Sequence, residues 1–210
     1  MLRGLRIYAA GFVLGALSSI ALFFLARDFY LSLLRLLAAK AGTQTAAVGS
    51  LPLMIILNNL LASFIGAYLG YLLARLFIYT DPPPSQASAR LLNALDGRLA
   101  GVDPQGLRFY LPLYLLPIFS LLFNGFILGG FLGLYISDLG QYAAKLYPHA
   151  ILEIPAIVLS GSIGLALGEE NVGALEGPGL RAALDREAIG TLPRYLLASV
   201  MLIAAGLLEA

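Results

Sequence analysis

Residues 109–137 read FYLPLYLLPIFSLLFNGFILGGFLGLYIS and contain no charged side chain. About 20 consecutive apolar residues suffice for a helix to cross a hydrocarbon core roughly 30 Å thick. The stretch is therefore predicted to span a membrane, although it contains Pro112 and Pro117. Four more runs carry at most one charge each and are predicted spans. They cover residues 7–26, 51–79, 150–168 and 192–208.

The composition agrees with a membrane protein. Among 210 residues, 60% are apolar and only 12% are charged, which is too much apolar surface for one water-soluble core. The chain is therefore predicted to be all-α, a polytopic transmembrane bundle forming one integral membrane domain over residues 1–210. The lipid bilayer is its first expected partner.

The same composition argues against several function classes. The chain has no cysteine and one histidine, so a thiol nucleophile is excluded and a protein metal site lacks ligands. A formal net charge of +1 provides no basic stripe for nucleic acid. The connections are too short for a soluble enzyme domain. No enzymatic activity, cofactor, metal or nucleic-acid partner is expected.

The orientation is predicted from the basic residues, which are retained on the cytoplasmic side. With five spans, a cytoplasmic N-terminus places nine Arg and Lys residues inside and four outside. The first run is predicted to remain as an uncleaved anchor, and the C-terminus is predicted to lie outside. The fifth span looks short, because Tyr195 to Leu208 would rise only about 21 Å.

Three connecting segments have leucines at helical spacing with polar residues on the other faces. They are predicted to be short amphipathic helices at the membrane interface. These segments are residues 29–40, the stretch after Pro84 with Leu91, Leu92, Leu95 and Leu99, and residues 179–189, which end before Gly190.

Asparagine residues interrupt two of the apolar spans. Asn58 and Asn59 precede Gly66 and Gly70, and Asn124-Gly125 precedes further glycines. Small residues four apart let helices approach closely, and amides hydrogen-bond between helices, which is a structural interpretation of both sites. The functional alternative is a polar lining for a cavity.

The segment Pro148-His149-Ala150-Ile151-Leu152-Glu153-Ile154-Pro155 carries the most specific pattern. Pro148 suits a first helical turn, and His149 and Glu153 would then share one helix face. Pro155 removes a backbone hydrogen bond and is expected to kink the helix. The pair is predicted either to neutralise itself and fix the helix depth or to act in proton relay, ion binding or docking.

These positions also form a pattern together, comprising Asn58-Asn59, Asn124-Gly125, Pro148-His149, Glu153, Pro155 and Ala156. The pattern resembles the stage II sporulation protein M family of integral membrane proteins over most of the chain. Ala150 departs from it, since the family usually has glycine there. The resemblance implies a membrane anchor of a complex that remodels peptidoglycan, with the enzymatic activity on its partners. Relatives in organisms that make no spores have no assigned role.

Two functional hypotheses follow. The first is a non-enzymatic scaffold or anchor subunit that recruits other membrane or envelope proteins, and in which the glycine faces also favour self-association. The alternative is a transporter, channel or permease-like subunit that uses His149 and Glu153.

Overall fold

The computed structural model describes residues 1–80, 104–170 and 180–208, and every regular element in them is helical. The amphipathic stretch predicted after Pro84 lies outside the described residues. The elements in order are α1 (Leu2–Leu25), α2 (Arg27–Val48), α3 (Leu51–Phe64), the π-helix η1 (Ile65–Leu69), α4 (Gly70–Thr80), α6 (Pro104–Gly130), the 3₁₀-helix η3 (Leu132–Tyr135), α7 (Leu139–Pro148), the π-helix η4 (His149–Glu153), α8 (Ile154–Glu170) and α9 (Leu180–Leu208).

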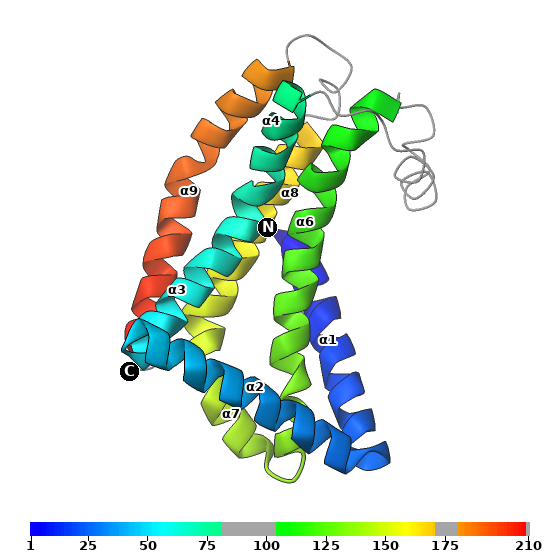
Figure 1. The fold of residues 1–210 in the computed structure, drawn as a ribbon, viewed down its shortest axis with the longest axis vertical. Helices are drawn as coiled ribbons and strands as arrows, with labels where there is room; N and C mark the ends of the chain where they lie inside the picture. Colours follow the sequence, from blue (N-terminus) through cyan, green and yellow to red (C-terminus); the bar gives the residue numbers. More distant parts are fainter. Residues whose placement is uncertain (81–103, 171–179, 209–210) are drawn as a thin grey trace.

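Five of the helical segments are long and apolar enough to cross a membrane, which confirms the predicted polytopic helical bundle. The continuous α3–η1–α4 segment, α6, α8 and α9 run along the long axis, and α1 lies beside the lower part of α6 (Figure 1). Many large apolar side chains point outward, such as Leu17 at 61% exposure and Val200 at 62%. Lipid is the natural solvent for such a surface.

The helices α1 and α6 are in backbone contact through reciprocal glycine pairs. Gly11 and Gly15 of α1 face Leu122 and Phe126 of α6, and Gly125 and Gly129 of α6 face Tyr8 and Phe12 of α1. A Cβ atom at any of the four glycines would overlap a carbonyl oxygen of the opposite helix. The predicted close-packing face at Gly125 is confirmed, and this residue serves helix association.

A second set of close contacts ties the α3–η1–α4 segment to its neighbours. Gly164 of α8 faces the carbonyl of Gly66 in η1, and Gly70 of α4 faces the carbonyl of Pro112 in α6. The missing side chains bring three spans together in the upper part of the bundle. The glycines that follow Asn58 and Asn59 therefore pack helices, as predicted.

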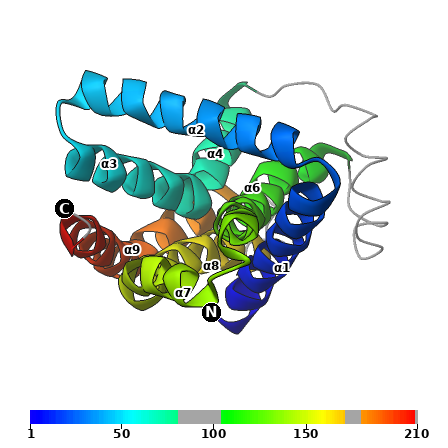
Figure 2. The same cartoon turned by 90° about the horizontal axis from the view of Figure 1, so that it is seen from below.

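At the opposite end, α2 forms a long connection between α1 and α3 (Figures 1 and 2). It covers 22 residues, more than the predicted amphipathic segment. It ends at Gly49, whose φ of 82° is a left-handed conformation that glycine adopts easily. The Ser50 hydroxyl then accepts a hydrogen bond from the Leu53 amide at 3.2 Å, so α3 begins with a side-chain cap.

The last span differs from its prediction. α9 is one helix of 29 residues, about 43 Å long, so the separate helix ending before Gly190 was wrong, and the apolar run 192–208 is the second part of a longer helix. Pro193 lies inside α9. Helices in membranes accept a proline when neighbouring groups compensate for the lost hydrogen bond.

The segment before α8 also differs. The third span ends at Gly130, and α7 forms a helix that was not predicted. Pro148 is the last residue of α7 and does not start a helix, because the chain continues through η4 into α8.

Candidate functional site

A cavity of about 510 Å³ lies among α1, α3, η1, α6, η4 and α8. It brings together four predicted residues from three separate spans, Asn58, Asn59, Asn124 and Glu153. The other polar residues of the lining are Tyr8 and Ser120. Pro155 and Gly125 are not part of the lining, and the side chains of Pro148 and His149 lie outside what the structure describes.

The cavity has an apolar rim. The Ser120 hydroxyl donates to the carbonyl of Ala62 at 3.5 Å, where α6 meets α3. On the side of α2, the helices α3 and α6 lie apart (Figure 1). Four side chains of the lining are 44–62% exposed, and they are Leu61, Phe119, Phe123 and Ile127. These exposed apolar side chains form the rim of the cavity, and lipid is the natural solvent for them.

The three asparagine amides differ in their hydrogen bonds. Asn124 Nδ2 donates to the carbonyl of Ser120 at 2.7 Å, and Asn58 Nδ2 donates to Met54 Sδ at 3.6 Å. Asn59 Nδ2 is buried and has no hydrogen-bond partner among the described residues. An amide donor without a partner in an apolar environment costs free energy, so Asn59 is the polar group with most to gain from a ligand.

The carboxyl group of Glu153 enters the lining from the end of η4. Hydrogen bonds in a π-helix join residues five apart, so the α-helical geometry assumed for His149 and Glu153 does not apply. Pro155 follows two residues later; it lacks an N–H, and its ring would crowd a preceding carbonyl in a regular helix. The wider π turn relieves this crowding. This is a physical reason why the chain forms η4 at the place where a kink was predicted.

A second π-helix, η1, also borders the cavity, since Ile65 lines it. π-helical turns are rare and occur frequently at functional sites. Neither π turn was predicted, and only Pro155 is a sequence indication for one of them.

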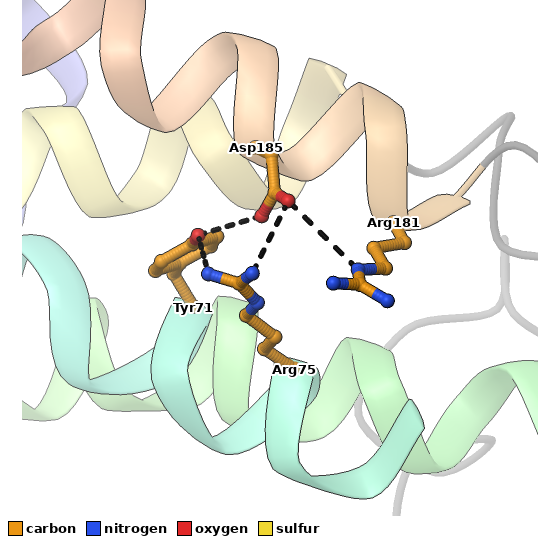
Figure 3. Close-up of polar contacts among 4 residues, drawn as sticks. All are labelled: Tyr71, Arg75, Arg181 and Asp185. Carbon is orange, nitrogen blue, oxygen red and sulfur yellow. Dashed lines mark hydrogen bonds and ion pairs between the residues drawn. The ribbon is translucent and has the colours of Figure 1, made fainter. Parts of the chain in front are cut away.

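A cluster of charged residues lies on α4 and α9 (Figure 3), and α4 is at the other end of the bundle from α2 (Figure 1). Asp185 lies 3.5 Å from Arg75 and 4.0 Å from Arg181, and it accepts a hydrogen bond of 2.7 Å from the Tyr71 hydroxyl. Arg75 also donates to Tyr71 at 3.1 Å. The partner of Arg75 was missed in the sequence. The indication was Arg75 itself, because a lone charge in a predicted span needs a counter-ion.

A comparison with protein families identifies the chain. The family model described as Stage II sporulation protein M matches residues 5–210. The chain belongs to this family. No curated protein and no solved structure matches it.

This member of the stage II sporulation protein M family is thus a multi-pass membrane protein, as its five apolar helices also indicate. Within the described part of the family member, no three acidic or histidine side chains gather closely enough to hold a metal ion. Its cavity offers amides, hydroxyls and one carboxyl group. These groups bind ligands by hydrogen bonding.

Proposed function

We propose that the protein is a non-enzymatic scaffold or anchor subunit of a membrane complex. The observation that carries this proposal is the exposed apolar rim of the cavity between α3 and α6, formed by Leu61, Phe119, Phe123 and Ile127. An apolar rim is accessible to membrane components, whereas a solute pathway needs access to water. Family membership supports a membrane role of the same kind.

The close packing of the rest of the bundle supports the same proposal. The contacts Gly66–Gly164 and Gly70–Pro112 bring backbones together there. Asp185 joins α4 to α9, and Arg3 pairs with Glu169 and donates to the Tyr114 hydroxyl, which joins α1 to α8 and α6. A tightly connected bundle is suited to holding partners in place.

The surface of α2 offers a place for such partners. Phe29 and Leu36 are 63% and 67% exposed, and Arg35 is also exposed. Apolar and basic side chains on one interfacial helix fit a neighbouring membrane protein or the lipid surface.

The test is affinity purification of the tagged protein from its native membrane in mild detergent, with cross-linking and mass spectrometry. We expect a stoichiometric partner that is reduced by a Phe29→Ala/Leu36→Ala double variant. A Val200→Ala/Leu207→Ala variant on the lipid-facing side of α9 is the matched control and should retain the partner. Purification of the chain alone, as a monomer or a homo-oligomer, would contradict the scaffold proposal.

A second candidate function is that of a transporter, channel or permease-like subunit. The polar lining of the cavity supports it. Asn58, Asn59, Asn124 and Glu153 converge inside the spans, and ionisable groups there commonly serve transport. This candidate requires flux through reconstituted liposomes that is lost in Glu153→Gln while the protein still assembles. Equal flux and equal pH dependence in that variant would remove its central residue.

We also propose that the N-terminus is cytoplasmic and the C-terminus outside. The charged cluster on α4 and α9 and the residues near Arg3 lie at the end that would then face the cytoplasm. Because the chain has no cysteine, single cysteines report orientation directly. Ser50→Cys should react with an impermeant thiol reagent on intact cells, whereas Arg186→Cys should react only after lysis. The reverse pattern would refute this orientation.

A further inference from the structure

We infer that the cavity between α3 and α6 binds a membrane amphiphile whose head group is uncharged and rich in hydroxyl groups. Pockets of roughly 300–1,000 Å³ commonly hold small ligands. A volume of about 510 Å³ therefore suits one polar head group and the first part of its chain. This inference goes beyond a scaffold role, since it assigns a ligand to the bundle itself.

The direction of entry comes from the rim. The cavity is lined by Ser120 and Ala62, which are hydrogen-bonded, and by the exposed Phe119 and Phe123, which lie within the apolar helix Pro112–Gly130. The rings of Phe119 and Phe123 stack with centroids 5.6 Å apart and planes at 12°. They form a flat apolar wall against which an acyl chain or the apolar face of a sugar ring packs. A ligand with an apolar tail reaches this rim by diffusing in the bilayer.

The charge of the head group follows from the lining. Glu153 is the one charged residue among the described lining residues, and none of them is basic. An ionised phosphate would meet a like charge, and no described lining residue supplies a cation to pair with it in a medium of low dielectric constant. Anionic head groups are therefore disfavoured.

The hydrogen-bonding capacity of the lining selects hydroxyl groups. Each amide of Asn58, Asn59 and Asn124 offers donors and an acceptor, a carboxylate accepts, and a sugar or polyol hydroxyl both donates and accepts. Asn59 Nδ2 has no partner among the described residues. The terminal torsion of asparagine is soft, so a rotation turns this nitrogen to a ligand oxygen at small cost. Three amides outnumber one carboxyl group, which favours a polyol over an amine.

The absence of tryptophan from the sequence allows a direct binding assay. Phe123→Trp places a single fluorophore on the rim, and Val200→Trp, on the outer face of α9, is the control reporter. Each is reconstituted in phosphatidylcholine vesicles with increasing amounts of one lipid with brominated chains, which quench on contact. The three probes are glucosyl diacylglycerol, phosphatidylglycerol and a diacyl trimethylammonium lipid.

We expect glucosyl diacylglycerol to quench Phe123→Trp at lower mole fractions than the two charged probes, whereas Val200→Trp should respond equally to all three. Adding Asn59→Leu to the rim reporter should weaken the apparent affinity for the glycolipid roughly three- to tenfold, the usual effect of one lost hydrogen bond. Asn124→Leu provides a second variant if Asn59→Leu fails to fold, as judged by helical circular dichroism and elution volume.

Three results would overturn the inference. Equal quenching of the rim reporter by all three lipids would leave only bulk lipid contact. A preference for the cationic lipid would assign the cavity to Glu153 alone. Equally tight binding of the glycolipid by the folded asparagine variants and the parent reporter would show that the amides do not hold the head group.

Discussion

The buried hydrogen bond between Ser63 of α3 and Ser160 of α8 gives the sharpest test of the packing. Both residues are about 1% exposed, and their hydroxyl oxygens lie 2.6 Å apart. Ser160 also donates to the carbonyl of Ala156 at 2.9 Å. A hydroxyl has a single proton, so Ser63 must donate to Ser160. Ser160→Ala removes the acceptor and leaves a buried donor, whereas Ser63→Ala leaves the Ser160–Ala156 bond intact.

The expected magnitude follows from this asymmetry. Hydrogen bonds between helices in membranes couple by about 0.6 kcal/mol on average and up to about 1.7 kcal/mol. For a short, fully buried pair we expect a coupling near 1 kcal/mol, about a fivefold change in the unfolding equilibrium. Ser160→Ala should cost more than Ser63→Ala, although Ser63 can recover part of the loss by donating to a carbonyl in its own helix.

The assay is a double-mutant cycle, with unfolding in mixed micelles followed by circular dichroism for the parent, Ser63→Ala, Ser160→Ala and the double variant. Additive effects within error would show that the two hydroxyls do not interact. A larger cost for Ser63→Ala than for Ser160→Ala would refute the assigned direction of the hydrogen bond.

Three further predictions concern stability. Gly129→Ala places a Cβ against the backbone of α1 and should lower the free energy of unfolding by about 1–3 kcal/mol, as overpacking does, whereas Gly130→Ala meets nothing within 4 Å and should leave the melting temperature in detergent nearly unchanged. Asp185→Asn should cost only about 0.2–1 kcal/mol at low salt, because its pair with Arg75 is partly exposed, and a difference that persists in high salt would contradict this. Burial raises the pKa of Tyr142 in α7 above its ordinary value of 10.0, so its contribution to stability is present below that pH and is lost as the pH rises through the folded pKa. In Tyr142→Phe, the melting temperature should therefore fall less as the pH rises above 10. An unchanged dependence of the melting temperature on pH would contradict this prediction.

The spans were predictable because lipid imposes one simple requirement on each of them. A run such as residues 150–168 has enough apolar length for one crossing, and its helix runs as α8 from Ile154. The glycine contacts were also foreseeable at Gly125, since small residues four apart indicate close packing. Apolar length and glycine spacing are local features of the sequence, and they largely determine where each span forms and which face it packs.

Features that depend on neighbours were harder to predict. Gly190 and Pro193 usually mark helix ends, yet α9 continues through both in its packed environment. The helix α7 was overlooked although Asp138 is a recognisable cap, accepting a hydrogen bond from the Gln141 amide at 2.9 Å. Asn58 and Asn124 were candidates from the sequence, but only the relative rotation of their helices decides that they share a cavity.

The reciprocal glycine contacts between α1 and α6 bear on how the protein is made. Gly15 is synthesised more than a hundred residues before Phe126, whose backbone it faces in the finished helix pair. At a ribosomal rate of about 5–20 residues per second, the first helix spends roughly 5–20 s in the membrane before its partner emerges. During that interval its bare glycine ridge is accessible to lipid, to insertion factors or to the same ridge on a neighbouring nascent chain. Assembly of the bundle therefore has a built-in delay whose length is set by the residues between the two helices.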